Sequence, residues 1–70
     1  MDAIDRETAA VMTTLAMNAN AQRGIAGTLA RKAPAATGLV AMHEREARLY
    51  ELLHAEVATG LLERLEAGRL

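Results

Sequence analysis

The chain of 70 residues has no cysteine, serine, tryptophan or phenylalanine, and it has only one proline and one tyrosine. Without cysteine, neither a disulfide bond nor a cysteine-based zinc site can hold the fold together. Two of the usual side-chain nucleophiles of enzymes, serine and cysteine, are missing as well. A composition almost free of aromatics also disfavours a deep ligand pocket. Because a core this small rarely stabilises itself, association with a partner is the remaining route to stability.

The charge of the chain gives no reason to expect a nucleic acid or a membrane as its partner. The formal net charge is −1, and Arg23, Arg31 and Lys32 form a basic group without aromatic neighbours that could stack on bases. Residues 8–22 are uncharged, but this stretch is too short and too polar to span a bilayer. The acidic N-terminus is unlike a secretory signal. We therefore expect a cytoplasmic protein that binds no nucleic acid and has no membrane span.

The sequence does contain two long helical patterns, one on each side of a turn. Pro34 marks the turn, since proline inside a helix removes a hydrogen bond and clashes with the preceding turn. The patterns predict a first helix over about 3–32, a turn over 33–38 and a second helix over about 39–67. Thr37 is the predicted N-cap of the second helix. Residues 1–70 are thus predicted to be a single all-α domain, a helical hairpin that dimerises into a four-helix bundle.

The first helix carries an apolar seam with a polar middle layer. Its two rows, each with a spacing of seven residues, are Ile4, Val11, Asn18 and Ile25, and Thr8, Leu15, Gln22 and Leu29. Such a pattern is typical of a coiled-coil contact, in which a polar layer fixes the register. We expect Asn18 and Gln22 to have this structural role, with the Tyr50 hydroxyl as their hydrogen-bonding partner. Gly24 and Gly27 weaken the helix, but we expect it to continue through them.

The second helix is apolar over a wider surface than one partner helix can cover. Seven of its apolar residues share one face, namely Leu39, Met42, Leu49, Leu53, Val57, Leu61 and Leu65. Leu52 and Leu62 fall on the opposite side. The excess apolar surface needs a second copy of the chain or a larger protein to cover it. The residues predicted to form the interface are Val11, Leu15, Asn18, Gln22, Ile25, Leu49, Leu52, Leu53, Val57 and Leu61.

A group of histidine and glutamate residues in the second helix supports an alternative function. Its members are His43, Glu46, Glu51 and His54. Glu51 and His54 have the Glu-x-x-His spacing that ferritin-like di-iron proteins use on the helices of a bundle. The first helix has no acidic residue after Glu7, so two copies of the second helix would have to supply every ligand. The alternative is therefore a metal-binding bundle, whereas the main expectation is a protein without metal.

We expect a protein without catalytic activity and without a cofactor. The threonines have no histidine and acid at a spacing that would activate them, and the sequence has no glycine-rich phosphate loop. The expected function is protein–protein interaction, as an adaptor, regulator or assembly subunit that acts through helical-bundle packing. The sequence leaves open whether the partner is a second copy of the chain or a larger protein.

Overall fold

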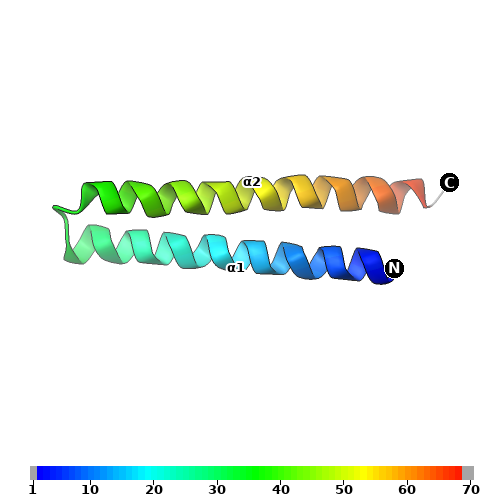
Figure 1. Ribbon diagram of the computed structural model, residues 1–70, viewed down its shortest axis with the longest axis horizontal. Coiled ribbons are helices and arrows are strands. Elements are labelled where there is room, and N and C mark those ends of the chain that lie inside the picture. Colours follow the sequence, from blue (N-terminus) through cyan, green and yellow to red (C-terminus); the bar gives the residue numbers. More distant parts are fainter. Residues whose placement is uncertain (1, 69–70) are drawn as a thin grey trace.

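The chain forms a hairpin of two long helices joined by a short turn (Figure 1). The computed structural model describes residues 2–68, in which α1 comprises Ala3–Lys32 and α2 comprises Thr37–Ala67. The helices lie side by side and antiparallel, in a molecule of 55 × 15 × 12 Å. The predicted all-α helical hairpin is confirmed, although α2 begins at Thr37 rather than at about residue 39.

The ends of α1 have favourable caps. Asp2 is the N-cap, and its side chain accepts a hydrogen bond of 2.8 Å from the Asp5 backbone N–H. This bond satisfies one of the free donors in the first turn of the helix. Arg31 and Lys32 lie in the last turn, where the helix dipole favours positive charge. These local features are sufficient to define where α1 begins and ends.

The turn is tighter than the sequence indicates, and the prediction that Thr37 caps α2 is wrong. The Ala36 N–H donates to the Ala33 carbonyl at 2.8 Å. Ala36 occupies the N-cap position, without a side-chain hydrogen bond, so Thr37 already belongs to the first turn of α2. Pro34 lies between the helices, where its missing N–H breaks no helical hydrogen bond.

Both helices pass through their glycines without a break. Gly24 and Gly27 lie within α1 and Gly60 lies within α2. Among residues 2–68, no glycine has a positive φ angle. The continuity expected for α1 is therefore present, because packing along the whole hairpin outweighs the conformational cost of single glycines.

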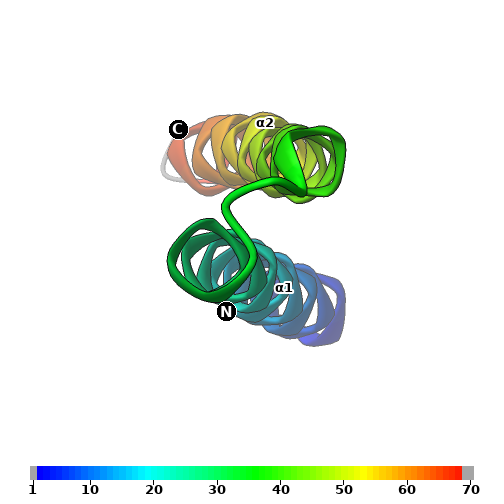
Figure 2. The same cartoon turned by 90° about the vertical axis from the view of Figure 1, so that its left-hand side faces the viewer.

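Small side chains fill the contact between the two helices. The buried apolar residues are Ala19, Ala26, Ala47 and Leu61. Short side chains let two helix backbones approach closely, whereas a valine or isoleucine at the same place would hold them apart. Seen end on, each helix faces the other along one side, and its remaining sides face outward (Figure 2).

Because these alanines form the contact, α1 turns a different face toward α2 from the one that the sequence predicts. The row that is exposed instead of facing α2 is Ile4, Val11, Asn18 and Ile25. The row that takes its place, buried or half-buried, is Asp5, Met12, Ala19 and Ala26. The companion row, half-buried as expected of a contact row, is Thr8, Leu15, Gln22 and Leu29. Half of the predicted seam is therefore wrong, because alanines one position further along pack more closely.

α2 is rotated in a corresponding way. Its buried and half-buried residues toward α1 include Val40, His43, Ala47, Tyr50, His54, Val57 and Leu61. Leu49 and Leu53, which the periodicity assigns to the contact face, are exposed. Leu49 and Leu53 thus lie beside the seam, whereas Leu61 lies in it.

Candidate interaction surface

Seven of the ten large apolar side chains that are exposed in residues 2–68 gather on one side of the hairpin. They are Ile4, Val11 and Ile25 of α1, and Leu39, Met42, Leu49 and Leu53 of α2. We call these seven residues the apolar flank; each is between 40% and 58% exposed. Because the helices are antiparallel, matching flanks of α1 and α2 lie on the same side of the hairpin. The two stripes therefore form one apolar surface.

The opposite side of the seam, which we call the polar flank, has a different chemistry. An ion pair between the Arg23 guanidinium and the Glu51 carboxylate connects the two helices there. Beside it lies a shallow hollow lined by Ala16, Ala19, Asn20, Glu51 and His54. Both charged side chains are about half exposed, so water screens the pair and its contribution to stability is small. The hairpin is thus apolar on one flank and polar on the other.

The polar layer that the sequence predicts is divided between two surfaces. Gln22 lies in the seam, where its Oε1 is 2.5 Å from Nδ1 of His43, so its partner is His43 rather than the expected Tyr50. Asn18 is exposed and lies on the side of α1 that carries Val11 and Ile25. Of the two polar residues, only Gln22 can fix the register within the hairpin.

A shallow groove marks the middle of the apolar flank. Its lining consists of Glu46, Leu49, Tyr50 and Leu53, all on α2. Tyr50 and Glu46 are half-buried, whereas the two leucines are about half exposed. The groove is open and mainly apolar, which suits an apolar side chain from a partner better than a polar ligand.

The residues of the predicted interface occupy three places. Those in the seam between α1 and α2 are Leu15, Gln22, Val57 and Leu61. Those on the side of the apolar flank are Val11, Asn18, Ile25, Leu49 and Leu53. Leu52 is 65% exposed and lies on the outer surface of α2. Five of these residues therefore lie together on a free surface, whereas four take part in the contact between α1 and α2.

The four candidate metal ligands do not converge within one chain. His43 contacts Gln22, and Glu51 is paired with Arg23. Glu46 lines the groove of the apolar flank, whereas His54 lines the hollow of the polar flank. Nowhere in residues 2–68 do three side chains of histidine, cysteine, aspartate or glutamate come together as a metal site. A site built from these residues would need two chains.

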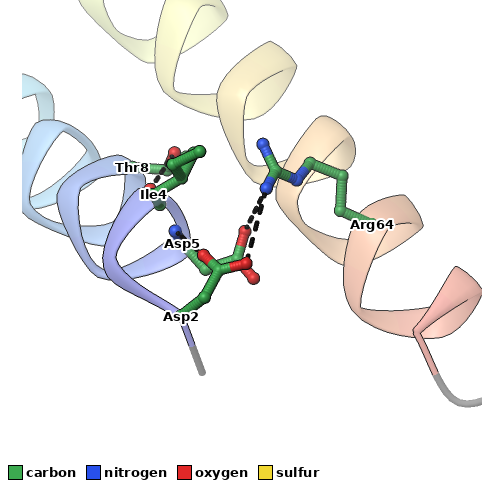
Figure 3. A network of polar contacts seen from close by, with 5 residues as sticks. All are labelled: Asp2, Ile4, Asp5, Thr8 and Arg64. Atoms are coloured by element: carbon green, nitrogen blue, oxygen red, sulfur yellow. Dashed lines mark hydrogen bonds and ion pairs between the residues drawn. The ribbon is translucent and has the colours of Figure 1, made fainter.

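The open end of the hairpin holds a polar cluster that sequence reasoning missed (Figure 3). Asp5 is buried, with 9% of its side chain exposed, and its Oδ1 lies 3.1 Å from Nη2 of Arg64. Oδ2 of Asp2 also lies 3.9 Å from Nη2 of Arg64. Oδ1 of Asp5 has no hydrogen-bond donor in residues 2–68, so Arg64 stabilises it through charge alone. The signal was available, since Asp5 precedes Met12 and Ala19 in the same seven-residue row.

The hydroxyl groups of four threonines bond to their own helices. Thr8, Thr13, Thr14 and Thr59 each donate to the carbonyl oxygen four residues earlier, at distances between 2.8 and 3.2 Å. Such bonds hold the hydroxyl against the backbone. These threonines therefore have a local structural role in the hairpin.

Comparison of the chain with known proteins finds no relative. The chain matches no protein-family model, no curated protein and no solved structure. In residues 2–68, neither helix has the length and hydropathy needed to cross a membrane. The apolar flank is therefore the feature of the molecule that indicates a function.

Proposed function

We propose that this hairpin is a non-catalytic protein–protein interaction module whose contact surface is the apolar flank. The observation that carries the proposal is the placement of the apolar side chains: three alanines and Leu61 are the buried apolar residues of the seam, while seven larger apolar side chains on one flank remain about half exposed. A contiguous apolar surface of this kind, bordered by polar residues, is typical of interaction sites. Packing a partner on it would complete a four-helix bundle.

The energetics of burial favour the same conclusion. Full burial of a Val, Leu, Ile or Met side chain contributes about 1.5–3 kcal/mol, so covering a half-exposed one adds about 1 kcal/mol. Alanine buries little area, and three of the four buried apolar residues of the hairpin are alanines. The seam alone is therefore a weak core, and the apolar flank holds most of the burial that remains available.

Two leucines of α2 offer a matched test of this surface. Leu53 belongs to the apolar flank and is 47% exposed, whereas Leu62 lies away from the flank and is 56% exposed. We expect Leu53→Asp to convert an assembled protein to monomer and to lower its helicity, because the partner would have to bury a charge. Leu62→Asp should leave the mass and the helicity as in the unmodified protein.

The masses of the unmodified protein and of the two variants can be compared by native mass spectrometry, with protein purified without chelator or added metal. A metal-free dimer that Leu53→Asp dissociates and Leu62→Asp preserves would support the proposal. Equal behaviour of the two variants would refute the flank as the contact surface. Extra mass equal to one or two metal ions per dimer would instead support the alternative site of His43, Glu46, Glu51 and His54.

A further inference from the structure

We propose that the occupant of the apolar flank is the same flank of a second copy of the chain, with the two turns at opposite ends of the bundle. This inference rests on the proposed function and specifies its partner and orientation. It is carried by an unequal distribution of charge along the hairpin together with the position of Asn18 on the flank.

The two ends of the hairpin have opposite charge. Residues 18–52, the half nearer the turn, contain five basic and three acidic residues, a formal charge of +2. The rest of the chain, residues 1–17 and 53–70, contains six acidic and three basic residues, a formal charge of −3. One end of this long molecule is therefore basic and the other acidic.

Two symmetric ways exist to stack one hairpin on another through the same flank. If the two-fold axis runs along the hairpin, the turns lie at the same end and like charges face each other. If the axis runs across the hairpin, the turns lie at opposite ends, and the basic half of each copy covers the acidic half of the other. Neighbouring helices are antiparallel in both arrangements, so helix dipoles do not distinguish them. The charge distribution favours the second arrangement.

The spacing on α1 fits the same axis. Asn18 lies seven residues after Val11 and seven before Ile25, and all three are exposed on the same side of α1. An axis across the hairpin at Asn18 would stack α1 on α1 of the second copy. It would place each Val11 against an Ile25 and the two Asn18 amides against each other. A side-chain amide has both donors and an acceptor, so two of them can satisfy each other at the axis. A buried asparagine pair would also penalise slipped registers.

The absence of cysteine from the chain makes the orientation measurable. Ala35 is exposed in the turn and lies off the apolar flank, so Ala35→Cys can carry a spin label without disturbing the contact. With the axis at Asn18, the two labels are separated by twice the rise over 17 residues, about 50 Å. With the turns at the same end, only the width of neighbouring helices separates the labels, so the distance between them is below about 25 Å. Pulsed electron paramagnetic resonance of the labelled dimer distinguishes these distances.

The outcomes separate the orientation from the proposed function. A distance of about 50 Å that disappears in the Leu53→Asp background supports the inference. A short distance in a dimer that still depends on Leu53 overturns the orientation and leaves the contact surface intact. A monomer overturns the second copy as the occupant. A dimer insensitive to Leu53→Asp overturns both the inference and the proposed function.

The salt dependence of dimerisation provides an independent check, with opposite signs for the two arrangements. Salt screens interactions between exposed charges. If basic halves cover acidic halves, added sodium chloride should raise the dissociation constant, as measured by analytical ultracentrifugation. If like charges face each other, added salt should lower it, and that result would contradict the proposed orientation.

Discussion

At the scale of single residues, the most consequential contact is the one between Asp5 and Arg64. Asp5 occupies a contact position that every later member of its row fills with an apolar side chain. A buried carboxylate is costly unless a positive charge lies close to it. Arg64 supplies that charge from the opposite helix, and Asp2 contributes to the same cluster (Figure 3). The pair therefore joins the free ends of α1 and α2.

Removal of the Arg64 charge should loosen the open end. We expect Arg64→Gln to lower the free energy of unfolding by about 1 kcal/mol, because Asp5 loses the positively charged partner that it has within residues 2–68, while water can still reach the half-exposed Arg64 position. Arg45→Gln is the matched control, since Arg45 is exposed on the outer surface of the same helix. Urea unfolding at one fixed protein concentration compares the two. Equal stabilities would show that the Asp5–Arg64 contact contributes nothing.

At the scale of the elements, each helix is continuous although its sequence contains glycines. Gly24 lies inside α1, and a Cβ atom added there would meet no atom within 4 Å. Glycine in a helix interior costs roughly 0.5–1 kcal/mol relative to alanine, because it loses more backbone freedom on folding. Space is therefore not the reason for glycine at this position.

Gly24→Ala should stabilise the hairpin by about 0.5–1 kcal/mol. Thermal unfolding followed by circular dichroism measures the gain. Gly68→Ala serves for comparison, since Gly68 follows the end of α2 and its added Cβ would already contact backbone carbonyls at 3.5 and 3.6 Å. A destabilised Gly24→Ala protein would mean that a partner approaches this part of the backbone closely.

At the scale of the whole molecule, the hairpin is long and thin, with a core made mainly of alanine. A two-helix molecule of 55 × 15 × 12 Å has much surface and little interior. Small scaffolds without disulfides or metals commonly gain their stability by oligomerising. Folding and association should therefore be linked in this protein.

This linkage predicts that thermal stability depends on protein concentration. If a dimer is the folded form, the melting temperature should rise as the concentration rises, because mass action favours the associated state. Circular dichroism over a wide range of concentrations tests this, with Leu53→Asp as the variant in which the dependence should disappear. A melting temperature independent of concentration in the unmodified protein would show that the hairpin is stable by itself.

The sequence by itself determined the helical hairpin. Pro34 excludes a continuous helix, the apolar periodicity extends almost from one end to the other, and Asp2 with Arg31 and Lys32 defines the limits of α1. These are local effects, since each depends on residues within one or two turns of the backbone. The seven residues of the apolar flank were also recognisable as apolar positions at helical spacing.

Only the tertiary structure decided which apolar face is the contact and which is the free surface. Periodicity gives the width of an apolar stripe but not its centre, and both faces of α1 satisfy the same seven-residue spacing. The choice depends on how closely two backbones can approach, which Ala19, Ala26 and Ala47 permit and Val11 or Ile25 would prevent. For the same reason, Gln22 pairs with His43 and Asn18 is left on the flank. Close packing at these alanines thus left the seven residues of the apolar flank exposed, and the proposed function depends on that outcome.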